Sequence, residues 1–134
     1  MGRLIVFLLF AGLFVNAQSK KELKENKIKQ ITTYNYITKL GKTYKVKDKY
    51  RVFNVKGYLV KEVEYNKEGK LKFIKKYYYN SDNDKIKEEL FDNAKKLEKT
   101  TLYSYKEGLK VSKKVFNGKG VLVSKKEFEY LHFD

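Results

Sequence analysis

The sequence contains no cysteine, no proline and no tryptophan, and its only histidine is His132. The absence of cysteine excludes disulfide bonds, thiolate metal sites and a lipid anchor attached to cysteine. His132 lies two residues from the end, where chains usually fray, and no nucleophile–histidine–acid set can be assembled around it. We therefore predict a protein that is not an enzyme and that uses no metal or other cofactor.

Arginine is also scarce, since Arg3 and Arg51 are the only two among 31 basic residues. With 16 acidic residues the net charge is +15, which favours anionic partners such as nucleic acid, acidic polysaccharide or an anionic membrane surface. Dedicated phosphate recognition usually recruits the planar fork of arginine, so nucleic acid is the least expected of these. The competing interpretation is a solvated surface without a ligand, because polar faces and sheet edges need charge in any case.

Long apolar runs are absent except for residues 4–15, which follow the short basic start at residues 1–3. A basic start, an apolar run of this length and the small residue Ala17 before Gln18 predict a secretory signal over 1–17, cleaved between these two residues. Twelve residues rise only about 18 Å as a helix, which is short for a membrane span. We expect a secreted protein, periplasmic or extracellular, that is not a lipoprotein and has no membrane span after cleavage. The remaining length suits a single domain.

Residues 18–27 are charged and lack a clear apolar period. Ser19 and Glu22 have the spacing of a capping box, which allows a short helix. The apolar residues that follow keep helical spacing poorly, so we predict a mobile, charged lead-in over 18–27, with a short helix as the lesser alternative. A β-repeat domain is predicted over residues 28–134.

A repeated unit fills most of that domain. It consists of an aromatic residue, Asn or Asp, two variable residues, Gly, one further residue and an aliphatic residue. The clear copies cover residues 53–59, 65–71 and 116–122, and weaker copies begin at residues 79, 91 and 105. Successive copies start 11 to 14 residues apart. Self-similarity at a nearly fixed period predicts a repeat fold.

The repeated unit has the chemistry of a tight turn between antiparallel strands. An Asn or Asp side chain hydrogen-bonds to its own backbone at the first position of a type I turn. The residue three places after it, which is the Gly of the repeated unit, needs a positive φ. Gly57, Gly69 and Gly120 occupy that position in the clear copies, and Asn83 and Lys95 occupy it in two of the weaker ones. Such a turn followed by a left-handed residue makes a hairpin with a bulge.

Between the turns, β-branched and aromatic residues alternate with polar ones at period two. One face of residues 71–79 reads Leu71, Phe73, Lys75, Tyr77 and Tyr79, starting aliphatic and ending aromatic, and 97–105 and 122–130 follow the same order. With two further strands near 31–37 and 43–53, we predict an all-β antiparallel meander of seven or eight strands. We expect an open, curved sheet with an aromatic face that is covered and a lysine-rich face that is not, although curling or closure stays open at this stage.

The unit Tyr-Asn/Asp-x-x-Gly-Lys-Leu resembles the YD repeats of the Rhs (rearrangement hotspot) family and its short secreted relatives, over residues 53–130. It is more distantly similar to MORN-type repeats, whose two-strand units have nearly the same length as two units here. The present chain departs from the YD pattern in using mostly Asn in place of Asp. The resemblance implies repeats that serve as scaffold, build extended β surfaces and contact sugars or partner proteins without catalysis.

The acidic clusters give little sign of chemistry. Residues 81–84 contain two aspartates, but counting from Asp82 the calcium-loop positions for Gly and Glu hold Lys87 and Asn93. The acids at 62 and 64 share a strand face, and those at 88 and 89 point to opposite faces, so neither pair is specific for glycoside hydrolysis. We predict no metal site and no catalytic residue.

Lysine pairs in the middle of separate strands are the best binding candidates. Stacked in a meander they would form a basic ladder with tyrosine platforms, which suits an acidic glycan or a single-stranded nucleic acid. The candidates are Lys75, Lys76, Lys113, Lys114, Lys125, Lys126, Tyr77 and Tyr103. Tyrosine is also a good strand former and lysine protects edges, so a purely structural interpretation competes.

Taken together, these residues predict a secreted, non-catalytic module with a structural or binding role at the cell envelope, whose ligand is a polysaccharide or a protein. The alternative is an inhibitor or immunity-like protein that masks a partner protein. Oligomeric state is not predicted.

Overall fold

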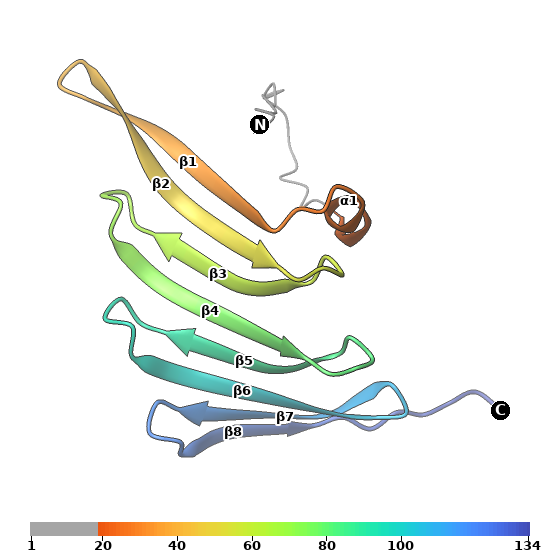
Figure 1. Ribbon diagram of the computed structural model, residues 1–134. Coiled ribbons are helices and arrows are strands. Elements are labelled where there is room, and N and C mark those ends of the chain that lie inside the picture. Colours follow the sequence, from red (N-terminus) through yellow and green to blue (C-terminus); the bar gives the residue numbers. More distant parts are fainter. Residues whose placement is uncertain (1–18) are drawn as a thin grey trace.

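The computed structural model describes residues 19–134, and the expected signal and its cleavage point lie outside this range. Eight strands form one antiparallel sheet, and each strand pairs with the next in chain order (Figure 1). The strands are β1 (Gln30–Lys39), β2 (Lys42–Phe53), β3 (Leu59–Tyr65), β4 (Leu71–Tyr79), β5 (Lys85–Phe91), β6 (Leu97–Lys106), β7 (Leu109–Asn117) and β8 (Leu122–Glu127). The predicted all-β antiparallel meander of seven or eight strands in an open sheet is confirmed, and the number of strands is eight.

Within the segment expected to be a lead-in, a short helix is present instead. Helix α1 (Lys20–Glu25) begins at Ser19, whose Oγ accepts a hydrogen bond from the backbone N–H of Glu22 at 3.2 Å. The capping-box spacing of Ser19 and Glu22 therefore predicted this segment better than its poor apolar period did. Leu23 is buried, and Gly57 lies so close to α1 that a Cβ there would come 2.5 Å from the carbonyl oxygen of Lys20. No helix within residues 19–134 is long and apolar enough to cross a membrane.

Five of the six predicted turns have one geometry. In each, the Asn or Asp Oδ1 accepts hydrogen bonds from two backbone N–H groups, two and four residues further on, at 2.8–3.0 Å. The residue three places after it has a positive φ, between 61° and 83°, in all five turns. These turns begin at Asn54, Asn66, Asn80, Asp92 and Asn117. Even Lys95, the least suitable residue for this position, adopts a φ of 62° because the two side-chain hydrogen bonds hold the rest of the turn.

The sixth copy, which begins at Tyr105, forms a different and shorter turn. Position 106 is Lys, which offers no side-chain oxygen, and Gly108 comes one residue earlier than in the other copies. Glu107 and Gly108 both have positive φ and form a two-residue loop between the paired residues Lys106 and Leu109. A two-residue loop with two positive φ values is the type I′ hairpin. The β1–β2 connection uses the same arrangement at residues 40–41.

The sheet is a single layer. Contacts between secondary-structure elements occur only between neighbouring strands, and among residues 19–134 the only buried apolar side chains are Leu23 and Val63, with Thr101 the only buried polar one. The expectation of one covered aromatic face is therefore wrong. Runs such as Lys75-Lys76 and Tyr77-Tyr78-Tyr79 place the same residue types at odd and even positions, so both faces carry lysines and aromatic rings.

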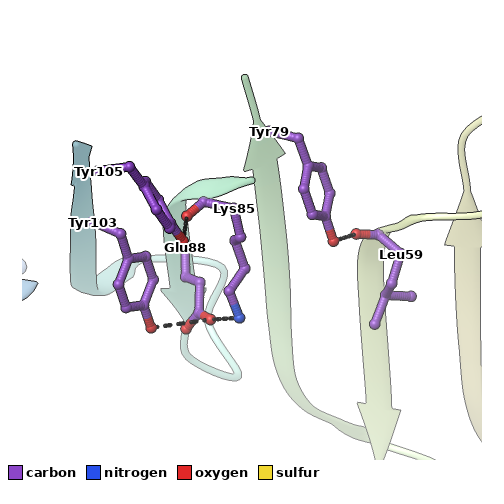
Figure 2. Close-up of polar contacts among 6 residues, drawn as sticks. All are labelled: Leu59, Tyr79, Lys85, Glu88, Tyr103 and Tyr105. Atoms are coloured by element: carbon purple, nitrogen blue, oxygen red, sulfur yellow. Dashed lines mark hydrogen bonds and ion pairs between the residues drawn. The ribbon is translucent and has the colours of Figure 1, made fainter. Parts of the chain in front are cut away.

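Three tyrosine hydroxyls connect the strands in pairs, and Figure 2 shows two of them. Tyr79 donates to the carbonyl oxygen of Leu59 at 2.6 Å, and Tyr105 donates to that of Lys85 at 2.7 Å. Tyr130 makes the third such bond, to the carbonyl oxygen of Lys110 at 2.7 Å. Each bond spans 20 residues. Tyr79 and Tyr105 lie at or near the end of β4 and β6, and Tyr130 lies just after β8; each is bonded to a residue at or near the start of the preceding strand. The last aromatic residue of the alternating pattern thus makes the same hydroxyl-to-carbonyl hydrogen bond in three two-strand units, and we call this bond the tyrosine latch.

We expect Tyr79→Phe to lower the free energy of unfolding by about 1 kcal/mol, since it removes one hydrogen bond to a partly buried carbonyl. Denaturant unfolding followed by circular dichroism measures the change. Tyr58→Phe is the matched control, because the ring of Tyr58 packs 5.2 Å from that of Tyr79 but its hydroxyl makes no hydrogen bond within residues 19–134. Equal losses in the two variants would contradict the latch.

We expect Asn66→Ala to lower the free energy of unfolding by about 1–2 kcal/mol, because two backbone N–H groups lose their acceptor. Asn66→Asp should retain most of the stability, since Asp92 fills the same role in its own turn. Thermal unfolding of the unchanged protein and the two variants at one pH measures the order of their stabilities. If the aspartate variant were as unstable as the alanine variant, the side-chain acceptor would not be the stabilising feature.

Candidate functional site

The two faces of the sheet are assigned by the strand register, because side chains of paired residues lie on one face and neighbours in a strand alternate. We call the Val63 face the one that carries the row Tyr50, Val63, Ile74 and Phe91 across β2 to β5. The Tyr77 face is the other one, and it carries the row Tyr77, Glu88, Thr101 and Val115 across β4 to β7.

The six predicted lysines do not form one ladder. Lys75, Lys113 and Lys126 lie on the Tyr77 face, and Lys76, Lys114 and Lys125 lie on the Val63 face. In addition, β5 and β6 separate the two lysines of β4 from the other four. The structure therefore brings together only Lys113 with Lys126 and Lys114 with Lys125, each pair facing across β7 and β8.

The two predicted tyrosines come together on the Tyr77 face. The Nζ of Lys85 lies 5.4 Å from the ring centroid of Tyr77 and 5.5 Å from that of Tyr103, and it forms an ion pair with Glu88. Figure 2 shows the hydroxyl of Tyr103 reaching the same carboxylate, to which it donates at 3.3 Å. The carboxylate of Glu88 is thus shared by a lysine and a tyrosine, and the Nζ of Lys110 lies 4.5 Å from the ring centroid of Tyr103.

Burial and the carboxylates of the Tyr77 face stabilise the protonated form of these tyrosines. Burial raises the pKa of Tyr77 to about 12, with Glu62 and Glu88 adding to the shift. Burial also raises the pKa of Tyr103 to about 12, and Glu88 contributes through its charge and the hydrogen bond. A tyrosine with such a pKa holds its proton at neutral pH, so we interpret the cluster as structural.

A raised tyrosine pKa predicts a specific loss of stability in alkali. Below pH 10, the ordinary tyrosine pKa, the folded and unfolded chains bind the same number of phenolic protons, so the contribution to stability is complete. Between pH 10 and about 12 the unfolded chain loses protons first, and the contribution is lost. We expect absorbance at 295 nm to show a late tyrosine titration whose amplitude is smaller in the Tyr77→Phe, Tyr103→Phe double variant, with a remainder from Tyr78, Tyr79 and Tyr105, whose pKa values are also raised. Tyr36→Phe, at an exposed position outside the cluster, is the control and should leave the late part intact.

The Val63 face contains a groove of about 470 Å³ over β2 to β5, which we call the Val63 groove. Its volume falls within the usual range of ligand sites, roughly 300–1,000 Å³. The buried side chain of Val63 lies among its lining residues. The lining residues are Tyr50, Lys61, Val63, Tyr65, Leu71, Ile74, Lys76, Phe91 and Lys95. It therefore combines an apolar, aromatic surface with three ammonium groups.

The lysines at this groove lie near aromatic rings and have no acid partner. The Nζ of Lys76 is 5.1 Å from the ring centroid of Phe91, and that of Lys61 is 5.9 Å from that of Tyr50. Lys47 does not line the groove, but its Nζ lies 5.8 Å from the ring centroid of Tyr65, which does. None of these three lysines, nor Lys95, has a carboxylate within 4 Å among residues 19–134. Glu89 faces Lys76 across β4 and β5, but its carboxylate lies 3.6 Å from Lys87 and accepts a hydrogen bond from Tyr78. The charge of the groove lysines is therefore not taken up by an ion pair within the described chain and is available to an anion.

The remaining candidates have structural surroundings. Glu62 binds Arg51 at 3.0 Å, and Glu64 lies 3.7 Å from Lys72, so these two carboxylates are paired with bases. In the acidic segment 81–84 the backbone N–H groups of Asp82 and Asp84 bind the side chain of Asn80. Among residues 19–134 no group of three or more His, Cys, Asp and Glu residues is arranged to hold a metal ion.

Sequence reasoning found Lys76 but missed the rest of the Val63 groove. A usable signal was present, because the turn at 66–69 sets the register of β3 against β4. Counting outward from that turn pairs Lys61 with Lys76 and Val63 with Ile74. The register does not tell whether a second layer covers these residues, and none of the elements within 19–134 does.

Comparison with protein-family models and with curated proteins finds no significant match to this chain.

Proposed function

We propose that the protein is a non-catalytic binding module of the cell envelope, and that the Val63 groove binds an acidic polysaccharide. The observation that carries the proposal is the set of lysines without acid partners over an aromatic floor. Sugar rings have apolar faces that pack on aromatic side chains, and their carboxylate or sulfate groups would be bound by the surrounding ammonium groups.

The charge chemistry favours this ligand over a nucleic acid. Arg51 is the only arginine among residues 19–134, and its guanidinium is bound to Glu62. Bidentate recognition of phosphate depends on arginine, whereas lysine acts as a point charge that suits carboxylates and sulfates equally well. The envelope location rests on the expected secretory signal, and the scaffold role agrees with what the YD-repeat resemblance implies.

We expect the Lys61→Gln, Lys76→Gln double variant to bind an oligogalacturonate about tenfold more weakly than the unchanged protein. Each exposed ionic contact contributes about 0.5–1 kcal/mol, and two of them amount to about one decade in Kd. Isothermal titration calorimetry at two salt concentrations measures the loss, which should be accompanied by a weaker salt dependence.

The matched control is Lys75→Gln, Lys99→Gln, which removes the same charge from the Tyr77 face, where these two residues lie in one row with Leu90. It should retain most of the affinity. Equal losses in the two double variants would mean that net charge, not the groove, attracts the glycan. A second arm uses myristate, since a fatty acid also combines a carboxylate with an apolar surface. Binding of myristate without binding of the oligogalacturonate would overturn the polysaccharide assignment.

A further inference from the structure

Strand β8 leaves its outer edge unpaired within the part of the chain that the structure describes. It pairs only with β7, and the following residues continue along the same neighbour. Phe128 N–H donates to the carbonyl oxygen of Val111 at 3.0 Å, and the hydroxyl of Tyr130 donates to that of Lys110. The free backbone N–H and C=O groups on the other side can accept a further strand.

The β7–β8 hairpin has two facing lysine pairs in succession, whereas such pairs occur only singly elsewhere in the described sheet. In the centre, most charged residues that face each other have opposite charges, such as Arg51 with Glu62, Lys49 with Glu64 and Lys76 with Glu89, and lysine faces lysine once, at 61 with 76. In β7 and β8, by contrast, lysine faces lysine twice in succession, at 113 with 126 and at 114 with 125. Like charges directly opposite each other destabilise a sheet.

These two lysine pairs are on opposite faces, because neighbouring residues of a strand alternate. The only carboxylate within 4 Å of any of the four ammonium groups, among residues 19–134, is that of Glu127, which lies 2.8 Å from Lys125. The β8 edge is therefore positively charged on both faces at once.

Protection of the edge against aggregation explains only half of this pattern. Lysines on an edge strand discourage further pairing, which accounts for Lys125 and Lys126. It does not account for Lys113 and Lys114, which lie one strand further in. Moreover, Leu122 and Val123 at the other end of β8 are 48% and 60% exposed, so the edge remains apolar over part of its length.

We propose that the β8 edge binds an extended, acidic segment of a partner protein, which adds to the sheet as a ninth strand. Two adjacent acidic residues of that segment would point to opposite faces and meet the two lysine pairs. Apolar residues of the segment would pack beside Leu122 and Val123. A second copy of this chain is a poor occupant, because its own edge strand β1 contains no acidic residue and carries Lys39.

A fluorescent eight-residue peptide tests the proposal with the full-length mature protein. The peptide has two adjacent glutamates flanked by alternating valine and threonine. Its control has the same sequence with every second backbone nitrogen methylated, which keeps the charge but removes the N–H donors a strand needs. We expect fluorescence anisotropy to show binding that methylation weakens at least tenfold. Amide hydrogen exchange should slow in β8 but not in β1.

Four double variants complete the test. Lys113→Gln with Lys126→Gln and Lys114→Gln with Lys125→Gln should each weaken peptide binding several-fold, and neither should lower the thermal stability, because each removes a repulsion. Lys39→Gln with Lys42→Gln removes a facing lysine pair at the opposite edge of the sheet and should leave binding unchanged. The Val63-groove variant Lys61→Gln with Lys76→Gln should also bind the peptide normally, which separates this proposal from the glycan site.

Three results would overturn strand addition at β8. The first is equal affinity for the methylated and unmethylated peptides, which would mean that charge alone attracts them. The second is an equal loss in the variant at 39 and 42. The third is the absence of peptide binding up to about 1 mM, the weak end of specific recognition.

Discussion

The side-chain oxygen of Asn or Asp at five turns is the interaction on which the rest of this structure depends. In most antiparallel sheets, a buried face selects the register, because a slip by one residue would turn apolar side chains to water. This sheet has almost no buried face, since Val63 and Thr101 are the only strand residues buried among those described. The register must therefore come from the turns. An Oδ1 atom that binds two backbone N–H groups sets the length of each loop and so determines which residues face each other.

Stability in such a single layer comes from contacts between neighbouring strands and not from a core. The tyrosine latches recur in three successive two-strand units, from β3 to β8, and each adds a bond near strand ends that the backbone ladder alone would leave open to fraying. Lysine ammonium groups lie over aromatic rings on both faces, which covers apolar surface with charge. Because each unit contacts only its neighbours, the energetics resemble those of repeat proteins, in which units and interfaces contribute separately.

The same lack of a second layer is what makes two kinds of surface available for binding. Residues such as Tyr50, Ile74 and Phe91 would form a core in a sandwich, but here they line an accessible groove. Facing charges are mostly opposite across the central strands, with Lys61 and Lys76 as the exception, and are both positive at two successive positions of β7 and β8. The groove and the β8 edge are separate consequences of one architecture, since the first depends on an uncovered face and the second on an open end.

The amino-acid sequence by itself determined the strands and the turns, because both depend on local chemistry. The side chain of Asn66 and the positive φ of Gly69 act on their own segment, so the hairpins, their spacing and the open meander could be predicted. The copy at Tyr105 was recognised only as a weaker one, and its shorter turn was not predicted. The helix at α1 was only a lesser alternative, since its stability depends on the burial of Leu23 and the close approach of Gly57. Which lysines lie together was decided by the tertiary structure alone. Lys75 and Lys76 are neighbours in the chain but lie on opposite faces, and Lys61 joins Lys76 only through the pairing of β3 with β4. Whether anything covers those faces depends on contacts between distant elements, which no local pattern encodes.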